Sequence, residues 1–165
     1  MSDRRSHDNK SCRMSTNEIE ILLVEDNPAD LDLALYALRH NNLVNQIQVA
    51  RDGEEALDFL FCRGRYSNRA SDHFPKLVLL DLKLPKVDGM EVLRQLKSDG
   101  QTKTIPVVIL TSSKEEKDLV QSYQLGVNSF IQKPVDFDQF RQIIKELQLY
   151  WLVVNQPPPA RRSSA

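Results

Sequence analysis

Five polar residues that could carry out phosphoryl chemistry lie at the ends of apolar runs in this 165-residue chain. Glu25 and Asp26 close the run ILLVED, Asp81 closes LVLLD, Thr111 lies in VVILTS, and Lys133 follows SFIQ. Carboxylates bind hard cations, and a carboxylate can attack phosphorus to give an acyl phosphate. A hydroxyl and an ammonium can then neutralise the oxygens of the transferred group. The sequence therefore indicates a phosphoryl-transfer site.

Asp81 is the candidate nucleophile, because it stands alone at the end of its apolar run. Three carboxylates that lie close together repel one another unless a cation is present, so Glu25, Asp26 and Asp81 are expected to bind Mg2+. The backbone carbonyl of Lys83 is a reasonable further ligand, because the turn after Asp81 must wrap around the site. The metal and the lysine would together neutralise the transferred group.

Strand-like runs alternate with helix-like runs along residues 19 to 155, so five strand–helix repeats predict one open α/β domain. Their nearly continuous apolar character fits parallel strands that are buried on both faces. In such sheets ligands bind outside the carboxyl ends of the strands, where all of the candidate site residues fall. The expected strands are Glu20–Glu25, Gln46–Ala50, Leu77–Asp81, Val107–Thr111 and Ser129–Gln132.

The expected helices carry start signals. Asn27 followed by Pro28 places a capping residue before a proline at the first helical position. Further helices are expected over Gly53–Cys62 and, after Asp88 as the cap, over Gly89–Ser98. The fourth and fifth are expected to open with a capping box, Ser113-x-x-Glu116, and a similar pattern, Asp136-x-x-Gln139.

Composition narrows the classes of function. A formal net charge of −1 supports neither a nucleic-acid nor a membrane-surface partner. No apolar run approaches the roughly 20 residues that a membrane span needs, and the amino terminus is not a secretory signal. Cys12 and Cys62 are expected to be free thiols in a reducing cytoplasm. Residues 1–18 are interpreted as a disordered arm and residues 156–165 as a disordered Pro/Ser tail, which leaves no room for an output domain.

Together these motifs resemble the receiver domain of two-component response regulators, over residues 19 to about 150. The resemblance rests on the acid pair, on DLKLPKVDG around Asp81, on Thr111 and on SFIQKP around Lys133. It implies a flavodoxin-like fold of strand order 2-1-3-4-5, and phosphorylation of Asp81 by a phosphohistidine of a sensor kinase. It also implies that Phe130 is the switch aromatic and that the Lys133–Pro134 bond is cis.

By that resemblance, the chain is a phosphoacceptor that promotes its own phosphorylation and dephosphorylation and is not an enzyme acting on separate substrates. A narrower resemblance is to the single-domain regulators that serve cyanobacterial phytochromes. It rests on RGRYSNRASDHFPK, on LVLLDLKLPKVDG and on the ending LQLYWLVVNQPPP. This implies a light-regulated histidine kinase as the phosphoryl donor.

Two segments lie outside the chemical site. Arg63–Lys76 is long for a connection between a helix and a strand, and is either a tolerated insertion or a docking loop. In the last helix, Phe137, Phe140, Ile143, Ile144 and Leu147 form one apolar stripe, but Tyr150–Val154 is apolar on every side. The latter segment either folds back onto its own domain or contributes, with the fourth helix, fifth strand and fifth helix, to a homodimer.

Three other functions remain as alternatives. A pseudo-receiver would bind partners without phosphorylation, although the full set of site residues argues against it. A phosphohydrolase with an aspartate nucleophile would need a second acid two residues after Asp81, where this chain has Lys83. A flavin protein would need a phosphate-binding loop after the first strand, and the sequence there is DNPAD.

Overall fold

The computed structural model describes residues 19–41, 46–133 and 136–159. Its strands are β1 (Ile21–Val24), β2 (Ile47–Ala50), β3 (Leu77–Leu80), β4 (Val107–Thr111) and β5 (Ser129–Gln132). Its α-helices are α1 (Pro28–His40), α2 (Gly53–Leu60), α3 (Gly89–Ser98), α4 (Glu116–Gln124) and α5 (Phe137–Gln148). The predicted disorder of residues 1–18 and 160–165, and the predicted isomer of the bond to Pro134, lie outside the described residues, as does Cys12.

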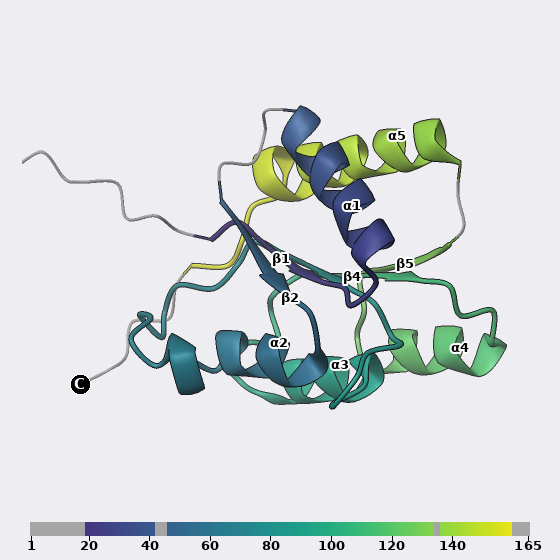
Figure 1. The fold of residues 1–165 in the computed structure, drawn as a ribbon. Helices are drawn as coiled ribbons and strands as arrows, with labels where there is room; N and C mark the ends of the chain where they lie inside the picture. The colour runs from purple at the N-terminus through teal and green to yellow at the C-terminus, as the bar shows by residue number, and fades with distance from the viewer. Residues whose placement is uncertain (1–18, 42–45, 134–135, 160–165) are drawn as a thin grey trace, which may run out of the picture.

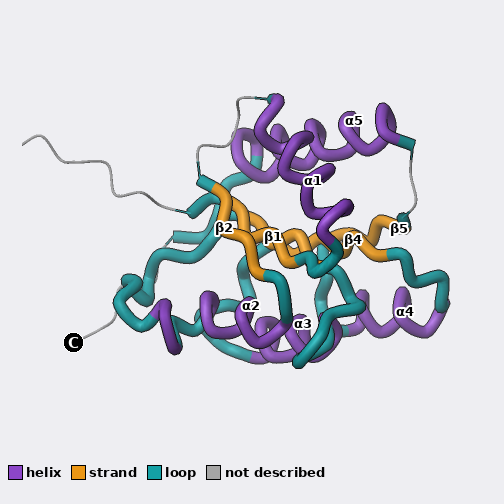
Figure 2. Tube along the Cα trace, in the orientation of Figure 1, coloured by secondary structure: helices purple, strands orange, loops and turns teal. Residues whose placement is uncertain are grey.

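The five strands form one parallel sheet in the order β2-β1-β3-β4-β5, which confirms the expected flavodoxin-like topology. Helices α1 and α5 cover one face, and α2, α3 and α4 cover the other (Figure 1). Figure 2 shows the strands as a single layer between the two layers of helices. All five strands therefore end on the same side of the sheet, which we call the carboxyl edge, and all five begin on the opposite side, which we call the amino edge.

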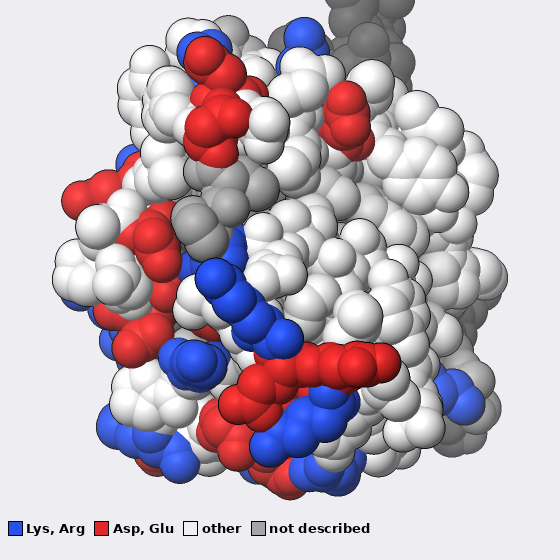
Figure 3. All heavy atoms as spheres, turned by 90° about the vertical axis from the view of Figure 1, so that its right-hand side faces the viewer, with Lys and Arg blue, Asp and Glu red and all other residues white. Residues whose placement is uncertain are grey.

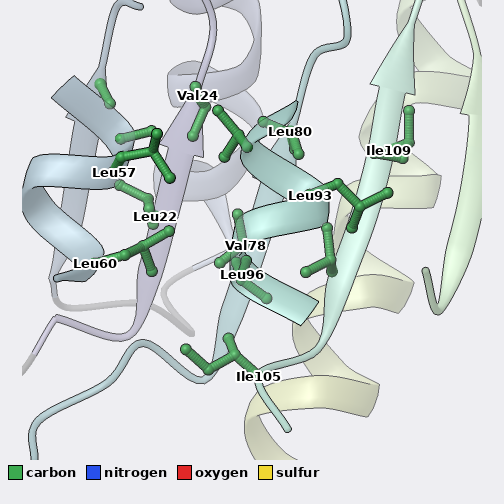
Figure 4. Close-up of a cluster of buried hydrophobic side chains, with 14 of the residues drawn as sticks. Leu22, Val24, Leu57, Leu60, Val78, Leu80, Leu93, Leu96, Ile105 and Ile109 are labelled. Atoms are coloured by element: carbon green, nitrogen blue, oxygen red, sulfur yellow. The ribbon is translucent and has the colours of Figure 1, made fainter. Parts of the chain in front are cut away.

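The three central strands β1, β3 and β4 are buried along their whole length, as their apolar sequences predict. The edge strands β2 and β5 are mostly half-buried, because each has a neighbour on one side only. The sheet divides the core into two clusters. One lies between the sheet and α2 and α3, where Leu22, Val78, Leu93 and Leu96 meet (Figure 4). The other packs under α1 and α5.

Four of the five helices begin with a side-chain cap, and the Asn27 and Asp136 caps accept hydrogen bonds from the backbone of Asp30 and Gln139 as predicted. The prediction of a capping box at Ser113 is wrong. Helix α4 starts at Glu116 without a side-chain cap, because its cap position is Glu115 and Ser113 lies two residues earlier. The Ser113 oxygen accepts from the N–H of Glu115 at 3.3 Å, and its hydroxyl donates to Asp118 Oδ2 at 2.5 Å.

Helix α2 ends at Leu60, two residues before the expected end. Cys62 has a left-handed backbone with φ of 54°, and its N–H bonds the carbonyl of Phe59. The N–H of Arg63 bonds the carbonyl of Asp58 at 2.8 Å. These two bonds form a Schellman motif, which satisfies the last carbonyls of the helix but places a cysteine where glycine is usual.

The insertion Arg63–Lys76 packs onto its own domain. The Arg69 guanidinium lies 3.6 Å from the centroid of the Phe59 ring and donates to the carbonyl of His73 at 2.7 Å. The hydroxyl of Tyr66 accepts a hydrogen bond from Gln48 on the edge strand β2. These contacts give the insertion a structural role beside an exposed sheet edge. A docking role for it stays a prediction.

The apolar segment after α5 is a π-helical turn, Leu149–Val154. Trp151 and Leu152 pack against the core under α1 and α5, whereas Tyr150, Val153 and Val154 are exposed. The segment thus folds back in part and leaves an apolar surface in part. Just before it, the fully buried amide of Gln148 joins α5 to α1 by donating to the carbonyl of Leu38 and accepting from Asn41. Over the described parts of the chain, no helix combines the length and the apolar character that a bilayer span requires.

Candidate functional site

The site lies at the carboxyl edge of the sheet, where the strand ladders bring residues from distant parts of the chain together. Val24 and Leu80 are paired across β1 and β3, so the residues that follow them, Glu25 and Asp81, are neighbours. On the other side, Thr111 accepts a backbone hydrogen bond from Lys133 at 2.6 Å. Parallel pairing of strands thus assembles the predicted site residues.

Glu25, Asp26 and Asp81 form an acidic cluster in which one carboxylate oxygen of each lies within 4.8 Å of the others. The side chains of Glu25 and Asp81 are buried, and that of Asp26 is exposed. Oxygen donors around a small volume that opens to water suit Mg2+, which is usually held by one or two carboxylates and keeps part of its hydration. The donor set therefore fits the predicted metal.

Lys133 extends into this cluster with a side chain that is 13% exposed. Its ammonium donates to Glu25 Oε2 at 2.8 Å and to Asp30 Oδ2 at 3.0 Å, and lies 3.7 Å from Asp81 Oδ2. Asp30 belongs to the first turn of α1 and was not among the predicted site residues. The lysine therefore has more carboxylate partners than the sequence indicated.

Burial and charge act against each other at these groups. Burial is the main cause that raises the pKa of Glu25 to about 6; the charge of Asp81 acts in the same direction, and Lys133 and the N–H of Asn27 act against it. For Lys133, burial lowers the pKa, but the hydrogen bond to Glu25 and the charges of Glu25 and Asp81 outweigh it, so its pKa lies above the ordinary value. The lysine is thus held as a cation, and the acids need a positive partner.

The other predicted residues surround Asp81. Thr111 is fully buried, and its Oγ1 accepts from the N–H of Ser113 at 3.2 Å. The exposed Lys83 donates its backbone N–H to Asp81 Oδ1 at 3.2 Å, so the turn after Asp81 does wrap around the carboxylate. Phe130 is half-buried and packs against the core on the α2–α3 side. It lies in the fifth strand, away from the acidic cluster itself.

Gly89 sets how closely α3 approaches the backbone of Asp81. A Cβ added at Gly89 would lie 2.1 Å from the carbonyl oxygen of Asp81 and 2.6 Å from Cα of Leu82. The Gly89 N–H donates to the Leu82 carbonyl at 2.8 Å. The glycine of the DLKLPKVDG motif is therefore required for close contact between backbones.

The surface on this side mixes both signs of charge. Figure 3 views the molecule from the right of Figure 1, the side to which the carboxyl ends of the strands point. Acidic and basic side chains lie together over its left and lower parts, whereas a broad area on the right carries neither. This face of the molecule therefore carries charges of both signs beside an uncharged area.

Residues 21–145 match the family model described as response regulator receiver domain. The chain belongs to this family. Response regulator Rcp1 of Synechocystis sp. is 39% identical to the receiver chain over 140 residues, which cover 85% of this chain and 93% of Rcp1.

Solved structures of response regulators are also similar to this chain. The phosphorylated cyanobacterial phytochrome response regulator RcpA is 42% identical, with a TM-score of 0.78, and the match covers 86% of this chain and 99% of that one. The bacteriophytochrome response regulator AtBRR is 55% identical, with a TM-score of 0.68, over 86% of this chain and 100% of that one. These relatives confirm both the family and the resemblance to regulators of phytochrome systems.

Proposed function

We propose that this receiver domain accepts a phosphoryl group on Asp81 from a sensor histidine kinase, in a reaction that depends on Mg2+. The observation that carries the proposal is the position of Asp81. Its buried carboxylate lies beside two further carboxylates and 3.7 Å from the ammonium of Lys133. One nucleophile, a metal-binding donor set and a fixed cation are what phosphoryl transfer to a carboxylate requires.

In the proposed step, an oxygen of Asp81 attacks the phosphorus of a phosphohistidine. A P–O bond forms while the P–N bond breaks, and the imidazole leaves with its electron pair and takes up a proton. Glu25, Asp26, Asp81 and the Lys83 carbonyl would hold Mg2+, which supplies positive charge to the phosphoryl oxygens. The protein's own residues then fix the acceptor and neutralise the transferred group.

Lys133 and Thr111 would contact the phosphoryl oxygens from β5 and β4. The ammonium of Lys133 already points at Asp81, and its raised pKa keeps it charged. The Thr111 hydroxyl would turn from the Ser113 N–H toward the new oxygens, and Phe130 would move inward into the space that this releases. The phosphorylated form would thereby differ from the free form at the surface of α4 and β5.

The proposed donor is a histidine kinase of the phytochrome type. RcpA is described as a cyanobacterial phytochrome response regulator and AtBRR as a bacteriophytochrome response regulator, at 42% and 55% identity. The test is transfer from a phosphorylated phytochrome kinase to this chain, compared with transfer from a kinase of an unrelated pathway. Equal transfer rates from both would refute the phytochrome assignment and leave the phosphoacceptor role intact.

The phosphoacceptor role is tested by incubating the chain with Mg2+ and acetyl phosphate and measuring the intact mass. One phosphoryl group should appear, decay after the donor is removed, and be absent with EDTA or in Asp81→Asn. Asp72→Asn removes an exposed aspartate of the insertion and should behave as the unaltered chain. A chain that takes no phosphoryl group from acetyl phosphate or from any kinase would instead be a phosphorylation-independent binding module.

The proposal includes a homodimer through α4, β5, α5 and Tyr150–Val154. Support comes from the exposed apolar side chains of Leu119, Val120 and Tyr123 on α4 and of Tyr150, Val153 and Val154 after α5. These two groups belong to elements on opposite faces of the sheet, so they form two separate apolar surfaces, and each is of the kind that marks an interaction surface. Light scattering at high concentration, with and without phosphorylation, should show the dimer.

Matched variants locate the interface. Tyr123→Glu should weaken the dimer, whereas Gln101→Glu adds a charge on the exposed loop after α3, outside the proposed interface, and should leave it unchanged. A monomer in both phosphorylation states would contradict the dimer.

A further inference from the structure

Lys133 is shared between two carboxylates with different surroundings. Glu25 belongs to the acidic cluster and is buried, with 6% of its side chain exposed. Asp30 is outside that cluster, and 44% of its side chain is exposed. A metal held by the cluster would take Glu25 away from the lysine, but it would leave Asp30 free to keep its bond.

The two carboxylates are built on the same short stretch of backbone. The N–H of Asn27 donates to Glu25 Oε1 at 3.1 Å, and the side chain of Asn27 accepts from the N–H of Asp30 at 3.0 Å. Asn27 is the cap of α1, so the first turn of this helix fixes the distance between the metal-binding end and Asp30. The lysine therefore meets both acids from one rigid helix start.

We propose that Asp30 is a positioning residue for Lys133, which keeps the ammonium paired and aimed at Asp81 while the metal occupies Glu25. The inference rests on the proposed metal-dependent function and adds a residue to it. Without Asp30, a metal that competes with Lys133 for Glu25 would leave the lysine, only 13% exposed, without a carboxylate partner outside the metal site.

The simpler explanation is that Asp30 only stabilises helix α1. An acid in the first turn of a helix is favourable because of the helix dipole, wherever its side chain points. That role does not require a hydrogen bond of 3.0 Å to a lysine that is 103 residues away in the sequence. The two explanations differ in one respect, which is whether the effect of Asp30 passes through Lys133.

A double-mutant cycle on Mn2+ affinity separates them. Mn2+ is titrated into the unaltered chain, Asp30→Ala, Lys133→Met and the double variant, and binding is followed by calorimetry. Asp30→Ala should weaken Mn2+ binding by about two- to fivefold, the range expected for loss of a partly exposed ion pair. In the Lys133→Met background the same change should have no effect beyond that of Asp32→Ala, which removes an aspartate from the same helix.

A second readout follows the lysine directly. In the metal-loaded chain, the Lys133 ammonium should give a protected signal in a 15N-selective NMR spectrum, and Asp30→Ala should abolish the protection while Asp32→Ala preserves it. Equal effects of Asp30→Ala and Asp32→Ala in both measurements, or an effect of Asp30→Ala that persists without Lys133, would overturn the inference alone. A chain that binds no Mn2+ at all would overturn both this inference and the proposed function.

Discussion

A lysine that is largely removed from solvent lies at the carboxyl edge of the sheet and another lies at the amino edge. The pKa values of these two lysines are shifted in opposite directions. At the carboxyl edge, the ammonium of Lys133 meets Glu25, Asp30 and Asp81, and its pKa is raised. At the amino edge, Lys97 near the end of α3 donates to the backbone carbonyls of Lys103 and Ile105, and burial lowers its pKa to about 8.

The difference lies in the partners. Carbonyl groups can accept hydrogen bonds from an ammonium, but they carry no net charge to offset the loss of water around it. Carboxylates supply that charge, and at the carboxyl edge they outweigh burial. Lys97 therefore ties the end of α3 to the loop before β4, whereas Lys133 remains a permanent cation beside Asp81. Burial of a lysine alone does not identify a functional site; its counter-charges do.

The largest expected effect comes from Lys133→Met. The variant removes the cation proposed to neutralise the phosphoryl oxygens, so the rate of phosphorylation by acetyl phosphate should fall by about one hundredfold or more. Lys97→Met should leave that rate unchanged, because Lys97 lies at the opposite edge. The rates are measured by intact mass over time. A fall of less than tenfold for Lys133→Met, or a similar fall for both variants, would break the contrast between the edges.

A smaller effect concerns stability against pH. Lys97 has a pKa of about 8 in the folded chain and 10.5 as the ordinary value, so between these values the unfolded chain holds a proton that the folded chain has lost. Stability from this group therefore rises with pH across that window. Relative to Lys97→Met, the free energy of unfolding of the unaltered chain should increase by about 2 kcal/mol from about pH 7.5 to about pH 9.5.

Urea unfolding of both proteins at the two pH values measures this difference. The comparison with Lys97→Met removes the titration of groups that the two chains share. A difference in unfolding free energy that does not change with pH would mean that Lys97 is charged in the folded chain, as Lys133 is, and the contrast would be lost.

The smallest expected effect is a gain in stability. Cys62→Gly replaces a residue with a left-handed backbone by the one that adopts it without strain, at the amino edge and away from the chemistry. The variant should be more stable by about 0.5–1 kcal/mol, with unchanged phosphorylation. Cys62→Ala removes the thiol but keeps the β-carbon, so it should not be stabilised. Thermal unfolding compares the three chains, and equal stability of the glycine and alanine variants would show no backbone strain.

Much of the fold could be predicted from the sequence because its signals are local. Apolar runs between capped helices specified the strands, and α3 was predicted with its cap at Asp88 and both ends correct. The start of α4 was wrong because the pattern Ser113-x-x-Glu116 does not reveal that the serine oxygen accepts from the N–H of Glu115, which is itself the cap position of the helix. Local patterns indicate which residues can cap a helix, but they do not show which partner the cap will choose.

Most residues of the candidate site could also be predicted from local sequence signals. The prediction was incomplete because it missed Asp30. The acid pair, Asp81, Thr111 and Lys133 each end an apolar run, which the parallel sheet gathers at one edge. Asp30 has no such mark, since an acid in a first helical turn is common. Only the direction of α1 from its Asn27 cap brings it to Lys133. Its sequence mark was a spacing of four residues after Asp26.

Gly89 has a consequence for how this chain can change. Its missing side chain leaves room for the Asp81 carbonyl, so any β-carbon there would push on the peptide that carries the proposed phosphoacceptor. A substitution that adds and removes no charge would then act on the proposed reaction through displacement of the main chain alone. The size of the side chain at position 89 therefore controls how far the backbone of Asp81 is displaced. The graded loss from alanine to larger residues would measure how much movement of Asp81 the chemistry tolerates.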